Sequence, residues 1–381
     1  MKSIICISTT PWKAHFTSKQ QVMSRLTDCK IAYIDPPVTM IARFKDKSLK
    51  DYGKQSKKEQ INDNFTVYRL PLFFPFYNKY RWINKLNQML FVKPLIAKIK
   101  KEQGFEDAVL WTYTPTAADV IDKTEKSKLV YHCVDRHSAY KGMISAEVVD
   151  GEEKELCEKA DVVFTTATGL YETLAPYNPN TYYTPNGVDF NLFNSAYTQP
   201  LECPEEIEQL AHPIFGFVGY LQEWVDYEIL DKLAKERPDG TVLLIGPIAD
   251  KANVDKLLEN PNVVAIGAKP QKELPAYIRQ FDVCLNVFRK SKLSKDVSPL
   301  KFYEYMATGK PIVSTEQPAQ VTEYADVIYI ASDGEQFVKC CNTAVLEVNE
   351  QRKQKQLEYA EMASWDKRVE NMRNILKKHG V

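Results

Sequence analysis

The segment from Ser298 to Thr315, SPLKFYEYMATGKPIVST, most constrains the fold because it contains both ends of one helix and the strand that follows. Ser298 is a suitable N-cap, and Pro299 suits the first helical position, where its missing N–H costs nothing. Gly309 is typical of the residue that ends a helix, and the apolar run after it is typical of a strand. The segment therefore predicts a helix followed directly by a buried strand, as in an α/β fold.

The entrance of this helix is a candidate site for an anionic group. The first amides of the helix, beginning at Leu300, lack intrahelical partners and carry partial positive charge. Lys301 adds a full charge beside them, and Glu304 follows one turn later, near where the ribose of a bound nucleoside diphosphate would lie. The alternative is that Lys301 and Glu304 form an exposed ion pair on an ordinary helix.

The stretch PLKFYEYMATGKPIV is similar to the nucleotide-sugar signature of group 1 (family-4-like) glycosyltransferases of the GT-B fold. The segment PNGVD, residues 185–189, is similar to the one that precedes their interdomain linker. The resemblance implies an α/β fold with two doubly wound, Rossmann-like domains that face a cleft. It also implies that Lys301 holds the diphosphate and Glu304 the ribose of a nucleotide sugar, taken here as a UDP-sugar. No cofactor or bound metal is expected, because the helix dipole and Lys301 stabilise the leaving diphosphate.

The loop that begins at Gly219 corresponds to the phosphate-side loop of this family but departs from its pattern. The family usually has an Arg and a Lys where this chain has Tyr220 and Val225. Diphosphate binding is therefore expected to depend more on Lys301, on the helix amides and on Lys295 or Arg289. The alternative is that the basic segment 289–295 is a solvated lid.

The same resemblance implies further donor-side residues. The family's two glutamates, eight positions apart, correspond to Asp296 and Glu304, and the shorter Asp296 would contact the donor sugar. Two glycines that follow strands of the second domain would line the nucleotide base. The predicted donor-binding residues are thus Gly219, Tyr220, Gly246, Gly267, Lys295, Asp296, Ser298, Leu300, Lys301 and Glu304.

Strand-like apolar runs alternate with helical patterns along the chain, which is typical of parallel α/β sheets. At 381 residues and 44% hydrophobic content, the chain is long enough for two separate cores. We expect 1–197 to form an acceptor-binding Rossmann-like domain and 198–355 a nucleotide-sugar-binding one. By resemblance alone, 356–381 is expected to form a helix that crosses back to the first domain.

Composition limits the partners and the compartment. The 50 basic and 50 acidic residues balance, which argues against nucleic-acid binding. The eight cysteines include no Cys-x-x-Cys pair and indicate reduced, cytosolic thiols. No apolar run approaches the roughly 20 residues of a membrane span. We therefore expect a cytoplasmic protein that is at most peripheral on the inner face of the membrane.

Positive charge is concentrated near the N-terminus. Residues 78–101 contain seven Lys or Arg, no acidic residue, and several aromatic and aliphatic residues between them. This mixture is what a helix at a membrane interface needs, so the segment predicts contact with an anionic membrane surface. The alternative is a core-packing helix with a solvated basic face.

Asp135 is the candidate catalytic base, because it follows an apolar strand and would lie at the carboxyl end of a parallel sheet, where ligands bind. Its segment resembles that of inverting GT-B enzymes such as the xanthan glucuronosyltransferase, in which the Asp after this strand is the general base. His132 and His137 are rival bases. Alternatively, Asp135 caps the next helix or pairs with Arg136 or Lys141.

The acceptor side is expected to include Trp12 and His15, which lie in the loop after the first strand, and His137. A solvated loop histidine is the alternative interpretation of His15. The sequence thus predicts a metal-independent glycosyltransferase, with inversion modestly favoured. Its acceptor would be lipid-linked or a polysaccharide precursor, in cell-surface polysaccharide biosynthesis. The alternatives are a nucleotide-sugar epimerase of related fold and a non-catalytic sugar-nucleotide-binding assembly subunit.

Overall fold

The structure is a computed structural model that describes residues 3–14, 16–45, 49, 52, 56–140, 142, 144–249 and 254–381. The chain forms two compact units, Met1–Pro185 with Val369–Val381, and Asn186–Arg368. The sequence predicts functional domains at 1–197, 198–355 and 356–381. These boundaries stay a prediction, because the compact units do not show which part binds the donor and which binds the acceptor.

The first unit is built on an eight-stranded sheet in the order β3-β4-β2-β1-β5-β6-β7-β8, with β3 antiparallel to its neighbour and the other strands parallel. The strands are β1 (Ser3–Ile7), β2 (Lys30–Ile34), β3 (Lys58–Asn62), β4 (Phe65–Tyr68), β5 (Val109–Thr112), β6 (Lys128–Cys133), β7 (Val162–Thr165) and β8 (Thr181–Tyr183). Strands β1, β5 and β7 are buried along their whole length, as their continuous apolar runs predict, whereas the edge strand β3 is mostly exposed.

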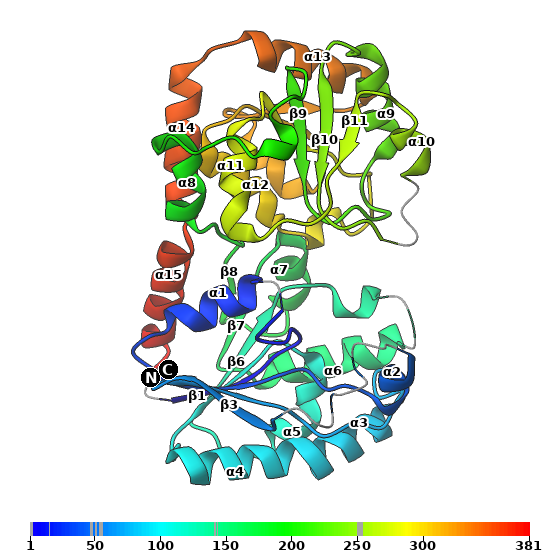
Figure 1. Cartoon of the computed structure of the whole chain (residues 1–381). Coiled ribbons are helices and arrows are strands. Elements are labelled where there is room, and N and C mark those ends of the chain that lie inside the picture. The colour runs from blue at the N-terminus through cyan, green and yellow to red at the C-terminus, as the bar shows by residue number, and fades with distance from the viewer. Residues whose placement is uncertain are drawn as a thin grey trace. The chain divides into compact units, whose positions relative to one another are not determined.

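Helices cover both faces of this sheet, with α1 and α4 on opposite sides in Figure 1. They are α1 (Ser18–Arg25), α2 (Met40–Lys45), α3 (Arg81–Asn87), a π-helical turn (Gln88–Val92), α4 (Lys93–Gln103), α5 (Ala118–Ile121), α6 (Ala146–Lys159) and α7 (Thr168–Leu174). The C-terminal part of α15 (Trp365–Lys378) also belongs to this unit, where Arg373 Nη2 donates to the Arg25 carbonyl at 2.7 Å.

The second unit contains a fully parallel six-stranded sheet in the order β11-β10-β9-β12-β13-β14. Its strands are β9 (Ile214–Val218), β10 (Thr241–Ile245), β11 (Val263–Ala265), β12 (Val283–Asn286), β13 (Ile312–Thr315) and β14 (Tyr329–Ala331). Its helices are α8 (Phe190–Thr198), α9 (Tyr227–Glu236), α10 (Asp255–Leu258), α11 (Leu274–Arg279), α12 (Leu300–Thr308), α13 (Gly334–Leu346) and α14 (Glu350–Met362).

Two hydrophobic cores flank this second sheet. One packs α11 and α12 against the strands, and the other packs α9 and α13 against them. Figure 1 shows α11 and α12 on one side of the strands and α9 and α10 on the other. Both units are therefore doubly wound α/β sheets, and this confirms the predicted fold class.

Candidate functional site

Three glycines lie side by side where neighbouring strands of the second unit end. Gly219 follows β9, Gly246 follows β10, and Gly267 lies two residues beyond β11. The amide of Gly219 donates to the Ile245 carbonyl at 2.8 Å, and the amide of Gly246 donates to the Gly267 carbonyl at 2.8 Å. A Cβ on Gly246 would lie 2.0 Å from the Gly219 carbonyl oxygen, so only glycine fits there. This close approach brings the backbones of neighbouring strands together at the carboxyl edge of a parallel sheet, where ligands bind, with Gly246 buried, Gly219 partly exposed and Gly267 exposed.

Lys301 reaches this glycine edge from α12. A Cβ on Gly219 would lie 3.1 Å from Lys301 Nζ, so the ammonium is almost in contact with the backbone there. Nζ also lies 3.6 Å from the ring centroid of Phe217 and 4.5 Å from that of Phe288, within the range of cation–π attraction. Burial lowers the pKa of Lys301 well below its usual value, and the Glu304 carboxylate opposes this shift. The Lys301 ammonium thus lies close to two aromatic rings and to the Gly219 backbone.

Glu304 lies one turn along α12, and Gln271 Nε2 donates to its Oε1 at 2.9 Å. Burial raises the pKa of Glu304 to about 7, while the Gln271 hydrogen bond and Lys301 act in the opposite direction. Among the described residues, no ion pair joins Lys301 and Glu304 within 4.0 Å, so the alternative of an ordinary exposed pair is wrong. The two side chains instead have different neighbours, Gln271 for Glu304 and Phe217 for Lys301.

The start of α12 differs from the sequence prediction. Pro299 is the N-cap, without a side-chain cap, and Leu300 is the first helical residue. Ser298 precedes the cap, and its Oγ accepts from the Asn186 amide at 3.1 Å, so the predicted capping role of Ser298 is wrong. Asn186 Nδ2 also donates to the Ser298 carbonyl at 2.7 Å. Two bonds from a distant segment therefore fix the start of the helix, leaving its first amides free of side-chain caps.

The other predicted donor-side residues lie in two loops. Tyr220 is half-exposed directly after Gly219. Val225 is buried, and its backbone pairs with that of Phe288 in an isolated β-bridge. The position where the family has a Lys therefore holds the backbone of Phe288, whose ring contacts Lys301. Lys295 and Asp296 belong to the 3-10 turn Ser294–Asp296, which Ser294 Oγ holds by accepting from the Ala319 amide at 2.9 Å.

In the first unit, Asp135 lies two residues beyond β6, and its side chain is 48% exposed. Lys19 lies at the start of α1, and its Nζ is 4.0 Å from Asp135 Oδ2. Ser145, not Asp135, caps the following helix α6 by accepting from the Val148 amide at 3.4 Å. The capping alternative for Asp135 is therefore wrong. Arg136 Nη2 donates to Thr173 Oγ1 at 2.8 Å and to the Gly169 carbonyl, and Lys141 lies outside the described residues.

The rival histidines are buried. His132 is 2% exposed and His137 is 6% exposed. Burial lowers the pKa of His132 to about 3 and that of His137 to about 4. Both ring nitrogens of His132, and Nε2 of His137, lack a hydrogen-bond partner among the described residues. His132 is enclosed, whereas the Asp135 carboxylate remains accessible.

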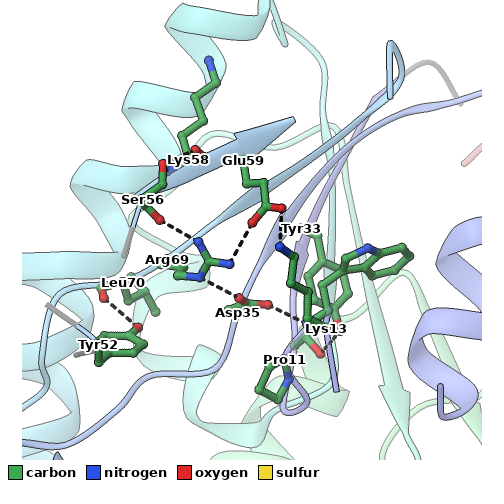
Figure 2. A network of polar contacts seen from close by, with 12 residues as sticks. Pro11, Lys13, Tyr33, Asp35, Tyr52, Ser56, Lys58, Glu59, Arg69 and Leu70 are labelled. Atoms are coloured by element: carbon green, nitrogen blue, oxygen red, sulfur yellow. Dashed lines mark hydrogen bonds and ion pairs between the residues drawn. The ribbon is translucent and has the colours of Figure 1, made fainter. Parts of the chain in front are cut away.

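The loop after β1 is fixed by a polar network (Figure 2). The Trp12 amide donates to Asp35 Oδ1 at 2.8 Å, and Arg69 lies 3.5 Å from Asp35 and 3.0 Å from Glu59. Lys13 completes the chain of charges by pairing with Glu59 at 2.6 Å. The Trp12 ring packs against Phe65 with a centroid distance of 4.1 Å. His15 lies outside the described residues.

Several partners of these residues were not predicted from the sequence. They are Phe217, Phe288 and Gln271 around α12, and Lys19 beside Asp135. None carries a local motif, because each reaches its partner from a different strand, loop or helix. Among the described residues, no group of three or more His, Cys, Asp or Glu side chains is placed to hold a metal ion.

The two doubly wound α/β units and the glycine edge of the second define a class of protein. The structure resembles sucrose-phosphate synthase from Thermosynechococcus elongatus with a TM-score of 0.70 and 14% identity, covering 99% of both chains. It resembles Anabaena HepE in complex with UDP with a TM-score of 0.66 and 14% identity, covering 99% of this chain and 100% of the other. The chain has the GT-B fold, with two Rossmann-like domains.

The sequence comparisons narrow this class. Residues 212–345 match the family model "Glycosyl transferases group 1", so this part of the chain is a group 1 glycosyltransferase domain. The putative teichuronic acid biosynthesis glycosyltransferase TuaH of Bacillus subtilis (strain 168) is 27% identical over 208 residues, which is 51% of each protein. The matched region thus spans about half the length of this curated relative. The resemblance stated from the 298–315 segment is confirmed.

Proposed function

We propose that the protein is a glycosyltransferase that moves a sugar from a nucleotide-diphosphate sugar to a lipid-linked or polysaccharide-precursor acceptor in cell-surface polysaccharide biosynthesis. The observation that carries the proposal is the Lys301 ammonium beside the Gly219 backbone at the start of α12. A lysine, the partly exposed Gly219 backbone and the first amides of α12 together suit a diphosphate. The group 1 domain and the teichuronic acid relative support the reaction class and the kind of pathway.

On the donor side, Lys301 and the amides at Leu300 would neutralise the charge that develops on the leaving diphosphate. Glu304 would accept hydrogen bonds from the ribose, with Gln271 holding its carboxylate. Gly246 and Gly267 would allow the base to approach the backbone, and the nearby loops with Tyr220, Lys295 and Asp296 would contact the remainder of the donor. A UDP-sugar is the proposed donor, supported by the UDP bound to HepE.

Asp135 is proposed as the general base. The acceptor hydroxyl oxygen would attack the anomeric carbon while the bond from that carbon to the diphosphate oxygen breaks, and the hydroxyl proton would pass to Asp135. Attack opposite the leaving group inverts the anomeric configuration, and Lys301 with the helix amides would stabilise the diphosphate without a bound metal. The accessibility of Asp135 and the burial of His132 and His137 support this choice of base.

The acceptor proposal is supported by an exposed apolar patch in the first unit, formed by Tyr80, Trp82, Leu86, Met89 and Leu90. Residues 82, 86, 89 and 90 follow helical spacing along α3 and the π-helical turn. Trp82 is 66% exposed, which is unusual for a side chain with so much apolar area.

The opposite face of the same helical segment packs into the core through Val92, Ile96 and Ile99. The segment therefore packs on the core as the alternative expected, but its outer face is apolar as well as basic. Lys79, Lys85 and Lys93 flank the patch, and no acidic residue occurs within 78–101. Apolar side chains surrounded by lysines suit the surface of an anionic membrane, where a lipid-linked acceptor would be found. Within the described ranges, no helix is long and apolar enough to span a membrane.

One experiment separates the proposed function from its alternatives. The protein is incubated with a panel of nucleotide sugars, and release of nucleoside diphosphate is followed with and without lipid-linked acceptors. A glycosyltransferase releases the diphosphate in an acceptor-dependent manner. An epimerase consumes the nucleotide sugar without an acceptor, and a binding subunit converts none of the panel.

A further inference from the structure

A second candidate binding site lies at the opposite edge of the sheet from the glycines of the second unit. A cavity of about 550 Å³ opens beside the residues that precede β12 and β13, and the ends of α8, α11, α12 and α13 and the start of α14 contribute to its walls. This volume is within the usual range of small-molecule sites, about 300–1,000 Å³. The glycine edge and Lys301 lie at the carboxyl ends of the strands, so this cavity is separate from the proposed donor site.

Two cations line the cavity without a carboxylate partner. Among the described residues, Arg279 and Lys310 form no ion pair within 4.0 Å, although Arg279 Nη1 donates to the Ala196 carbonyl at 2.7 Å. Lys310 is half-buried, and burial lowers the pKa of its ammonium. The positive charges of Arg279 and Lys353 lower it further. Burying a cation near other positive charges is unfavourable unless an anion binds beside it and compensates the charge.

The carboxylates around the cavity are engaged elsewhere. Asp282 Oδ2 accepts from the Ile214 amide and contacts His212 Nδ1, both at 2.6 Å. Glu350 pairs with Lys353 at 2.6 Å. Glu347 accepts from the Tyr329 hydroxyl at 2.7 Å and from Arg352 at 3.4 Å. Asp282 and the Cys284 thiol favour the charged form of Lys310, but burial remains the largest effect on its pKa.

The Lys310 ammonium is also not needed to cap α12. Gln356 Nε2 donates to the carbonyls of Met306 at 3.3 Å and Lys310 at 3.0 Å. Asn194 Nδ2 donates to the Ala307 carbonyl at 3.0 Å. Amides from α14 and α8 therefore satisfy the end of α12, and the side chain of Lys310 is left without a structural partner among the described residues.

We propose that this cavity binds a small phosphorylated molecule, with Arg279 and Lys310 contacting the phosphate. A phosphate dianion supplies the charge that the two side chains lack, and arginine and lysine form strong charge-assisted bonds with it. The cavity has room for a hexose attached to the phosphate. The inference is independent of the proposed sugar transfer, because it needs neither the donor nor the acceptor.

The test is calorimetric titration of the full chain with inorganic phosphate and with glucose 6-phosphate, at constant ionic strength, with glucose as the unphosphorylated control. Saturable binding of either phosphate compound is expected, whereas glucose gives none. Lys310→Met should weaken that binding at least tenfold. Lys301→Met should leave it within about twofold, which excludes occupation of the donor site.

Thermal unfolding without ligand provides a second readout. Lys310→Met removes a half-buried charge that has no ion-pair partner among the described residues, so its Tm should equal or exceed that of the unmodified protein. No saturable binding of either phosphate compound, or binding that survives Lys310→Met, would overturn the proposal. A lower Tm for Lys310→Met without ligand would also overturn it, because the lysine would then stabilise the fold itself.

Discussion

Lys19 Nζ lies 4.0 Å from Asp135 Oδ2, and the Lys19 side chain is only 7% exposed whereas that of Asp135 is 48% exposed. Burial lowers the pKa of Lys19, and the Asp135 carboxylate opposes this shift. One carboxylate oxygen of Asp135 therefore lies near a buried cation, while the side chain remains about half exposed. Such an arrangement orients a base that must receive a proton from an acceptor hydroxyl.

Lys19→Met should lower kcat about tenfold, because the carboxylate loses the group that orients it, while the KM for the nucleotide sugar stays nearly unchanged. Lys19→Arg keeps the charge and should restore part of the loss. Steady-state kinetics with both substrates measure this division between kcat and KM. If Lys19→Met retains normal kcat, or if its effect is confined to donor KM, Lys19 does not position the base.

Lys301→Met should weaken binding of a nucleoside diphosphate by about 1.5–3 kcal/mol, because a charge-assisted contact with the diphosphate is lost. Titration calorimetry measures the change, and Lys339→Met, which removes an exposed lysine on α13, serves as the matched control. Equal affinity in the Lys301 and Lys339 variants would show that the diphosphate binds elsewhere.

Glu304 should make stability depend on pH, because its pKa in the folded protein is raised to about 7. The folded state then binds the proton more tightly than the unfolded state does. The stabilising contribution is complete below the unfolded pKa near 4.5 and is lost as the pH rises through about 7, with an upper limit of about 3 kcal/mol. Glu304→Gln removes this titration, so its Tm should rise relative to that of the unmodified protein between pH 5 and pH 8. A constant difference in Tm across that range would refute the shift.

The apolar patch should mediate membrane binding. Trp82→Glu should weaken sedimentation with anionic vesicles at least tenfold, because a large apolar side chain is lost and a negative charge is added. Leu346→Glu changes an even more exposed apolar residue, in the second unit, and is the matched control. Binding of the unmodified protein should also fall as salt increases. If vesicle binding is unchanged by Trp82→Glu, by the content of anionic lipid and by the salt concentration, the patch is not the contact surface.

The regular elements were largely predictable because local patterns determine them. Gly309 ends α12 in the left-handed conformation, with φ of 67°, as its position after the apolar helix predicts. The start of the same helix was not predictable in detail. A serine before a proline is a plausible cap, but Ser298 bonds to Asn186, which is 112 residues earlier in the chain. Tertiary hydrogen bonding thus overrides the local capping signal.

Sequence patterns suggested candidate site residues on one helix and at the ends of strands, but not most of the side chains that surround them. Lys301 and Glu304 could be proposed together from the sequence because one helix carries both, one turn apart; their roles stay a prediction. Phe217, Phe288, Gln271 and Lys19 were not found, because their proximity depends on how strands and loops far apart in sequence meet. The burial that separates His132 from Asp135 is likewise a property of the folded sheet.

Turnover of Asp135→Asn tests the proposed inverting transfer most directly, because the substitution keeps the shape of the side chain and removes its basicity. Sugar transfer is measured with the nucleotide sugar and acceptor that the unmodified protein accepts, donor affinity by calorimetry, and the anomeric configuration of the product by NMR. We expect at least a hundredfold loss of turnover, nearly unchanged donor affinity and an inverted product from the unmodified protein. Near-normal turnover of Asp135→Asn, or a product that retains the donor's anomeric configuration, would contradict the proposed mechanism.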